Sequence, residues 1–415
     1  MKLVKMSLLA AALISTSAFA IDNVKVSGDA KLYYSTNDVE TTDLLGRTGD
    51  SLFSKATSSG QAALGLGLTA DLTEGVSAGA HLTALTALGL YNNLVGNVWE
   101  GGPQDEYWFD EAWIAGTLGK TTAKVGRMTL DTPLAFTETW SIAKNTFEAA
   151  VLLNQDIPDT TLVGAYIGEH NGGGSYFAGV TADWDGDQNT NFGPLNAGKG
   201  AYAVGAVNNS WAPLTAQAWF YNLPSAANAY WLQADLAMDF GLVAGVQVNG
   251  IDAKAYTKDS TNMAYAAKVG YEMKDVFTVS VAGSQVGEND NGIGVVSNVS
   301  GYGQSKLYTE AWWNYGYITI HDTTAINVTA TTPEALTWVA LGLYATQSTS
   351  NEYFAGGSDL EMTEITVTAS KSFGPLDASL AYIMTDANDQ NLADAAEADS
   401  GESYSTVQAY LTYNF

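Results

Sequence analysis

The 415-residue chain contains no cysteine, eight prolines, and only 17 lysines and arginines against 44 aspartates and glutamates. The absence of cysteine excludes a disulfide framework and is compatible with an exported bacterial protein. The scarcity of basic residues gives a formal charge of −27, so the chain is a poor candidate for nucleic-acid binding, which requires a basic surface. After residue 20 no segment has 18 consecutive apolar residues, which excludes a transmembrane helix. The helical periodicity typical of an α/β enzyme is missing as well.

The first twenty residues predict a secretory signal peptide. Lys2 and Lys5 precede an apolar run at 6–13, and Ala18-Phe19-Ala20 forms a cleavage site of the small-x-small type. The apolar run is too short to span a membrane. We therefore expect residues 1–20 to be removed and residues 21–415 to form a single domain, the alternative being a buried N-terminal helix.

Strict alternation of apolar and polar residues recurs along the chain and predicts β-strands with two different faces. In the last segment, Val407, Ala409, Leu411 and Tyr413 alternate with mostly polar residues. Eighteen segments are strand candidates: 24–34, 64–72, 76–82, 107–118, 121–128, 146–155, 161–169, 198–208, 214–223, 226–239, 242–250, 263–273, 276–286, 324–331, 335–347, 360–373, 376–385 and 403–415.

The connections between these segments alternate in length. Short connections with Gly, Pro or Asp turn residues lie at 73–75, 119–120, 156–159, 240–241, 274–275, 333–334 and 374–375. Long polar connections lie at 35–60, 91–106, 129–145, 170–197, 251–262, 287–323, 348–359 and 386–402, and a brief link at 224–225 is the exception. This pattern predicts an all-β protein, a transmembrane antiparallel β-barrel of about 18 strands with short periplasmic turns and long extracellular loops. A soluble β-sandwich also alternates, but so many apolar stripes exceed one sandwich core, and small polar inner faces suit a wet lumen.

A closed barrel requires the last strand to pair with the first, 24–34. Outer-membrane proteins as a class end on an alternating strand with a terminal aromatic residue. The resemblance implies that residues 408–415, with Tyr413 and Phe415, form the signal that the barrel-assembly machinery recognises.

Two stretches resemble a known family. Residues 21–36, at the start of the expected mature chain, resemble the mature start of the Opr-type major outer-membrane porins of epsilon-class proteobacteria. Residues 124–170 resemble the outer-membrane porin D (OprD-like) family around its third loop, with Ala149 where that family often has Gly. The matching positions are Gly126, Thr132-Pro133-Leu134, Thr146-Phe147-Glu148 and Gly164.

The resemblance covers the whole expected mature chain and implies an 18-stranded diffusion porin of the bacterial outer membrane with no bound cofactor. Its partners would be outer-membrane lipid, lipopolysaccharide and small hydrophilic solutes, and its state would be the homotrimer common among porins. The third loop would fold inward and narrow the pore.

Selectivity in such a pore comes from charges that face each other across the narrowing. Around the third loop these are Arg127, Asp131, Glu138, Lys144 and Glu148. Arg127 has an ambiguous strand face, and a bend or bulge at Gly126 is one way to turn it inward. The alternative is that it pairs with a loop carboxylate.

Charged residues on the predicted inner faces indicate the ion preference. By parity the lumen-facing set is Lys25, Asp29, Lys31, Asp71, Glu111, Lys199, Asp235, Lys268, Glu272 and Glu364. Narrow members of the porin D family line one wall with a ladder of basic residues, but this chain is poor in them. Lumen-facing acids are at least as numerous and the chain is strongly acidic, so we expect a preference for cations. The alternatives are a channel for small organic acids, amino acids or peptides, and a barrel with a mainly structural or adhesive role.

Two loop segments leave alternatives open. Asp183, Asp185 and Asp187 resemble half of a calcium loop, but Gln188 and Pro194 stand where an EF-hand needs Gly and Glu, which leaves a loosely bound surface calcium ion as the remaining metal hypothesis. The aromatic segment 307–321 either folds into the barrel, caps its mouth, or adds strands.

Catalysis is not expected. The chain has three histidines, His81, His170 and His321, and their spacing implies no catalytic partner. We therefore predict a channel rather than an enzyme.

Overall fold

The computed structural model describes residues 22–39, 51–99, 102, 104–172, 190–294, 297–300, 303–353, 357–390 and 400–415, with the backbone alone for 389, 390 and 400–402. The predicted signal peptide and the calcium candidates Asp183, Asp185 and Asp187 lie outside these residues. No helix among the described residues has the length and apolar character needed to cross a membrane.

The described residues form one antiparallel sheet of 19 strands, in which each long strand pairs with its neighbours in the sequence. The strands are β1 Asp22–Asn37, β2 Ser58–Thr73, β3 Val76–Thr86, β4 Glu106–Leu118, β5 Thr121–Met128, β6 Phe147–Asn154, β7 Thr160–His170, β8 Gly193–Pro194, β9 Ala201–Asn208, β10 Leu214–Leu223, β11 Ala227–Ala237, β12 Leu242–Ala253, β13 Thr261–Met273, β14 Phe277–Val286, β15 Thr323–Thr332, β16 Ala340–Ser350, β17 Leu360–Phe373, β18 Leu376–Gln390 and β19 Ser400–Asn414. β8 is a two-residue addition to β7, so 18 described strands build the wall and the predicted number is confirmed.

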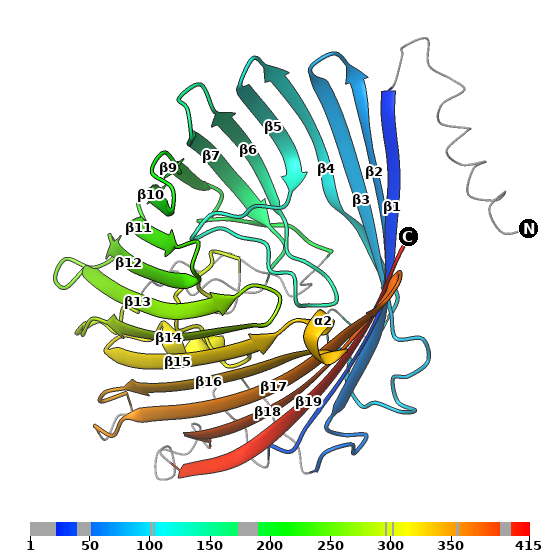
Figure 1. Ribbon diagram of the computed structural model, residues 1–415, viewed down its shortest axis with the longest axis vertical. Helices are drawn as coiled ribbons and strands as arrows, with labels where there is room; N and C mark the ends of the chain where they lie inside the picture. Colours follow the sequence, from blue (N-terminus) through cyan, green and yellow to red (C-terminus); the bar gives the residue numbers. More distant parts are fainter. Residues whose placement is uncertain are drawn as a thin grey trace, which may run out of the picture.

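The sheet closes into a barrel because β1 pairs with both β2 and β19. Leu32 lies opposite Ala62 on one side and Leu411 on the other. Figure 1 shows the strands following one another around the ring, from blue β1 to red β19, which lie side by side. Closure pairs the backbone groups of the edge strands, which a membrane-spanning sheet requires.

The two faces of the wall differ as the alternation predicts. On β2, Leu64 and Leu66 point outward and are 44% and 40% exposed, whereas Gly65 and Gly67 lie on the inner face beside His81. Large apolar residues are exposed in the same way on many other strands, which leaves an apolar outer surface far beyond that of a soluble monomer.

Most strand boundaries differ from the prediction by a few residues: β2 begins at Ser58 rather than at 64, β3 ends at Thr86 rather than at 82, and β18 ends at Gln390 rather than at 385. Residues 335–339 are not strand, because Glu334–Thr337 form the short helix α2 and Trp338 has a left-handed backbone, so β16 begins at Ala340. Lys199 lies in an exposed turn before β9, between the positive-φ residues Gly198 and Gly200. It is therefore outside the strand to which the sequence pattern assigned it.

The interior of the barrel is occupied by loops. A barrel of about 18 strands is too wide for its wall side chains to fill, which leaves room inside for additional chain segments and for water. In Figure 1 the cyan loop between β5 and β6 and the yellow loop between β14 and β15 run inside the ring. We call these loops L3 (129–146) and L7 (287–322).

Candidate functional site: a constriction inside the barrel

L3 is held inside the barrel by packing and by hydrogen bonds to its own residues and to L7. Leu134 is fully buried, and its backbone N–H donates to the Tyr221 hydroxyl on β10 (3.4 Å). The Asn298 amide of L7 accepts from the Phe136 N–H (3.2 Å) and donates to the Phe136 carbonyl (2.7 Å). Asn145 also donates to that carbonyl (3.0 Å). The prediction of an inward-folded third loop is confirmed.

L7 crosses the lumen and is anchored on the opposite wall. The Glu364 carboxylate on β17 accepts the backbone N–H groups of Trp313 (3.2 Å) and Asn314 (2.7 Å) and the Asn314 side-chain amide (2.9 Å). Glu364 is fully buried. Residues 307–321 are thus loop, with a 3₁₀ turn at Tyr315–Ile318, and they fold inward rather than adding strands.

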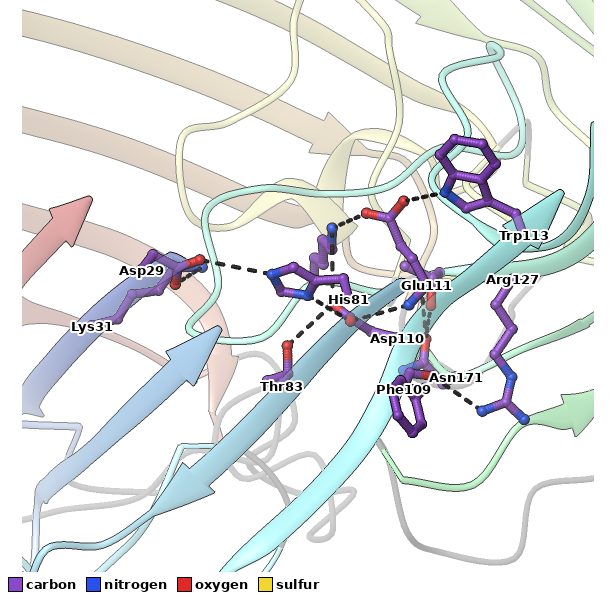
Figure 2. Close-up of polar contacts among 12 residues, drawn as sticks. Asp29, Lys31, His81, Thr83, Phe109, Asp110, Glu111, Trp113, Arg127 and Asn171 are labelled. Atoms are coloured by element: carbon purple, nitrogen blue, oxygen red, sulfur yellow. Dashed lines mark hydrogen bonds and ion pairs between the residues drawn. The ribbon is translucent and has the colours of Figure 1, made fainter. Parts of the chain in front are cut away.

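A charged cluster forms where L3 meets β3 and β4 (Figure 2). The pairing of β3 with β4 shifts between His81 and Leu82, so Asp110 is an extra residue and both Asp110 and Glu111 point inward. Asp110 lies 2.6 Å from His81 Nδ1 and accepts the Thr83 hydroxyl (3.1 Å). Asp110 is not among the residues predicted to face the lumen, because alternation allows only one of the two neighbours Asp110 and Glu111 to point inward and the prediction chose Glu111.

Lys144 of L3 connects the loop to this cluster. Its ammonium group pairs with Glu111 and lies 3.8 Å from Asp110. Across the cluster, Asp29 of β1 lies 4.0 Å from His81 Nε2 and 3.6 Å from the Lys31 ammonium. Four residues predicted from the sequence, Asp29, Lys31, Glu111 and Lys144, are brought together here.

A second polar cluster ties L7 to β11 and β13. Lys268 pairs with Asp235 (2.8 Å), and the Tyr308 hydroxyl of L7 donates to the same carboxylate (2.7 Å). Burial, with Asp235 beside it, raises the pKa of Tyr308 far above its ordinary value, so its hydroxyl stays a donor. Lys306 of L7 pairs with Asp131 of L3, which joins the two loops.

Arg127 and Glu148 form a cross-strand pair at the end of β5, with Nε 2.7 Å from the carboxylate. The guanidinium also donates to the Phe109 carbonyl (3.1 Å) and stacks on Phe192 at 3.9 Å. Arg127 pairs with Ala112 across β4 and β5, so by alternation the pair lies on the opposite face of the sheet from Lys124. Gly126 has a φ of +124°, but the pairing continues through it without a shift. A role for the pair at the constriction stays a prediction.

The remaining predicted residues have separate positions. Glu138 caps the tip of L3 by accepting the N–H groups of Trp140 and Ser141 (both 3.1 Å). Lys25 and Asp71 lie together near the short-turn end of β1 and β2, and Glu272 shares the row of Lys268. Their effect on ion passage stays a prediction.

Aromatic residues from three loops meet beside the charged cluster. Trp140 of L3 packs against Trp313 of L7 (5.2 Å between ring centroids), and Trp99 of the β3–β4 loop contacts both (5.6 and 5.3 Å). Tyr33 of β1 connects this group to the wall through Trp99 (5.3 Å) and Tyr410 (4.7 Å). The loops are therefore fastened to each other and to the strands.

A cavity of about 560 Å³ lies between these loops and the wall of β17, β18, β19 and β1. Loop residues Thr139, Trp140, Ser141, Trp312 and Trp313 line one side, and wall residues of which many carry hydroxyl groups line the other. The loops thus narrow the lumen without filling it.

No group of three or more His, Asp or Glu residues suited to holding a metal ion occurs in the part of the chain that the structure describes. The His81 cluster is an ion-pair network in which Lys144 occupies the space between the acids.

Comparisons with known proteins identify the fold. No protein-family model and no curated protein matches the sequence. Solved structures do match: OpdK of Pseudomonas aeruginosa with vanillate (TM-score 0.71, 12% identity, 95% of this chain and 98% of that one) and OccAB2 of Acinetobacter baumannii (0.71, 14%, 96% and 99%). OccK8 (OprE) of P. aeruginosa matches as well (0.67, 13%, 96% and 99%). The chain has the fold of these OprD/Occ porins over its full length, as the resemblance around the third loop implied. The narrower resemblance to epsilon-class porins stays a prediction.

Proposed function

We propose that the protein is an outer-membrane porin, a water-filled channel through which small hydrophilic solutes and ions diffuse passively, with a preference for cations. The observation that carries the proposal is the full-length match to solved porins combined with an L3 that narrows but does not fill the lumen. The apolar outer face of the wall supports a position in the membrane.

Cation preference is supported by charges at both the constriction and the mouth. Inside the barrel, Lys144, Lys268 and Lys306 are each paired with a carboxylate. At the end where the long loops lie, exposed carboxylates outnumber lysines among the described residues, and Asp259 lies so close to Asp290 that a hydrogen bond between them raises the pKa of Asp259. The described acids at this end include Asp252, Asp259, Glu288, Asp290, Asp322, Glu352, Asp359, Glu361 and Asp386. A mouth of one charge sign concentrates counter-ions.

The alternative of a channel for small organic acids has weaker support. Vanillate, bound in the OpdK structure, is such an acid. In this chain the two lysines of the cavity wall, Lys31 and Lys371, already face Asp29 and Glu334. These ion pairs do not form the ladder of free basic residues that an organic acid would use.

The test is reconstitution of the purified mature protein in a planar bilayer under a salt gradient. Stable current steps with a reversal potential on the cation side are expected. A reversal potential on the anion side would still support a channel but would assign its selectivity to the lysines. An absence of current steps from a folded, heat-modifiable barrel would contradict the open channel.

The predicted partners belong to the same proposal. We expect outer-membrane lipid and lipopolysaccharide around the apolar belt, assembly by the barrel-assembly machinery, and a homotrimer. Cross-linking followed by unheated electrophoresis tests the trimer, because three linked copies migrate together until the barrel is heated.

A further inference from the structure

The cavity beside L3 and L7 has two chemically different sides. The loop side presents the indoles of Trp140, Trp312 and Trp313, and Tyr410 adds a phenol from the wall. The facing wall is rich in hydroxyl groups. Its polar uncharged residues are Thr368, Ser370, Ser372, Ser379, Gln408 and Thr412.

The register places the polar side chains in adjacent rows. Ser370 pairs with Ser379, which pairs in turn with Tyr410, so one row runs across three strands. Residues at matched positions of neighbouring strands point to the same face. The rows therefore form a continuous surface of hydrogen-bonding groups opposite the indoles.

The charges of the lining cancel. It contains two lysines, Lys31 and Lys371, and two acids, Glu334 and Asp377. Lys371 pairs with Glu334, and Asp377 accepts the Ser372 hydroxyl (2.6 Å) and the Asn414 amide (3.0 Å). Lys31 lies 3.6 Å from Asp29, so a carboxylate ligand meets two lysines that are already paired, and the lining as a whole carries no net charge that would favour an ammonium ligand.

Two donors on the lining have no hydrogen-bond acceptor among the described residues. They are Nε2 of Gln408 and Nε1 of Trp313, on side chains that are 4% and 6% exposed. Both atoms are covered by protein, so a ligand reaches them only after a small shift of the side chain, and the cost of a buried donor without a partner favours such a shift.

We propose that this cavity is a binding subsite for a neutral carbohydrate of one or two rings. A pyranose ring has an apolar face of C–H groups, which packs on an aromatic ring, and a rim of hydroxyls, each of which both donates and accepts hydrogen bonds. A volume of about 560 Å³ lies in the range of small-molecule sites, roughly 300–1,000 Å³. The inference rests on the proposed channel and names the solute class that the channel would favour.

The experiment titrates maltose against the potassium current of single channels in a planar bilayer. Maltose is expected to interrupt the current. The Trp312→Ala variant should weaken the binding constant by about tenfold, which corresponds to about 1.4 kcal/mol. Trp312→Phe should restore most of the affinity, and Trp211→Ala is the matched control because Trp211 is 69% exposed in a turn outside the cavity. The double variant Ser370→Ala and Ser379→Ala tests the hydroxyl wall and should also weaken binding.

Several outcomes would overturn the subsite. Maltose that leaves the current unaffected, or interrupts it equally in the wild type and Trp312→Ala, contradicts it. So does interruption by benzoate or tetraethylammonium in place of maltose. Calorimetric titration of the detergent-solubilised protein measures maltose binding without conduction. A folded barrel with no current would contradict the proposed channel, whereas current without maltose binding would contradict only the subsite.

Discussion

Lys144 is the cation of L3 that lies between the acids Asp110 and Glu111 of the charged cluster. It pairs with Glu111 and lies 3.8 Å from Asp110. Replacing Lys144 by Met nearly keeps the length of the side chain but removes its charge, so Asp110 and Glu111 are free to attract passing cations. Because one unit charge at ~4 Å is worth ~1 kcal/mol even in water, cation preference should rise about fivefold.

The measurement is the reversal potential of Lys144→Met under the same salt gradient as the wild type. Lys254→Met is the control, because Lys254 is exposed in the β12–β13 loop. An unchanged potential in Lys144→Met would show that ions do not pass beside this cluster.

Glu364 is the buried acceptor that holds L7. Its replacement by Ala leaves the N–H groups of Trp313 and Asn314 without an acceptor inside the protein. We expect a loss of about 3 kcal/mol in the free energy of unfolding, because buried unsatisfied polar groups cost ~1–3 kcal/mol each. Guanidinium unfolding in detergent micelles, followed by tryptophan fluorescence, measures it. Glu361→Ala, an exposed position on the same strand, should change the stability little, and equal losses in both variants would contradict the anchor.

At the scale of the elements, the pairing of β1 with β19 requires a residue without a side chain at Gly28. Gly28 exchanges backbone hydrogen bonds with Phe415 (2.7 and 2.9 Å), and a Cβ at Gly28 would lie 2.4 Å from the Phe415 ring. Gly28→Ala must displace this ring, so the yield of heat-modifiable barrel after refolding into detergent should fall several-fold.

Gly116→Ala is the matched control, because a Cβ at this strand glycine meets no atom within 4 Å. Deletion of Phe415 should harm assembly in the same way, while barrels that do form should conduct normally. Equal refolding of both glycine variants would mean that closure does not depend on the Phe415 ring.

L7 contains a carboxyl group that makes its packing depend on pH. Glu310 lies inside the barrel beside Ser305, whose backbone N–H donates to it (2.8 Å), and burial raises its pKa from 4.5 to about 8. The unfolded chain therefore releases this proton at lower pH than the folded protein. The contribution of Glu310 to stability is complete below pH 4.5 and is lost as the pH rises toward about 8.

The check compares the unfolding free energy of the wild type with that of Glu310→Gln, which cannot titrate, between acidic and mildly alkaline pH. The wild type should lose stability relative to Glu310→Gln as the pH rises to about 8, with little further change above it. Glu288→Gln, exposed in the same loop, should show no such trend. If the unfolding free energy of the wild type instead rises relative to that of Glu310→Gln as the pH increases, the buried protonated carboxyl is contradicted.

Strands were predictable from the sequence because alternation is local, and loops were not because their contacts are distant. The 18 wall strands were predicted from alternation, whereas the inward L3 was implied only by the resemblance to the porin D family. The bulge that turns Asp110 inward breaks the alternation on which the prediction rested. The fastening of L7 to Glu364 joins residues about fifty positions apart, and neither partner carries a local signal for it.

At the scale of the whole molecule, a formal charge of −27 does not describe the lumen. Among the described residues, Lys31, Lys144, Lys268, Lys306 and Lys371 each pair with a carboxylate. Much of the excess acid lies outside the narrowing, at both ends of the barrel, for example Asp259 and Asp290 in the long loops and Glu74 and Asp275 in the short turns. Two mechanisms of cation preference follow, one from the mouth at long range and one from Asp29, Asp110 and Glu111 at short range.

Ionic strength separates these mechanisms. The Debye length falls from about 10 Å at 0.1 M salt to about 3 Å at 1 M, so the field of the mouth is screened while contacts of a few ångströms persist. We expect the cation preference to fall at least twofold over this range. A triple variant, Asp259→Asn, Glu288→Gln and Asp290→Asn, should have a weaker preference at 0.1 M and match the wild type at 1 M. The measurement is the permeability ratio at several concentrations with a fixed gradient. A preference that persists at 1 M and is unaffected by the triple variant would assign selectivity to the constriction, where Lys144→Met then becomes the decisive variant.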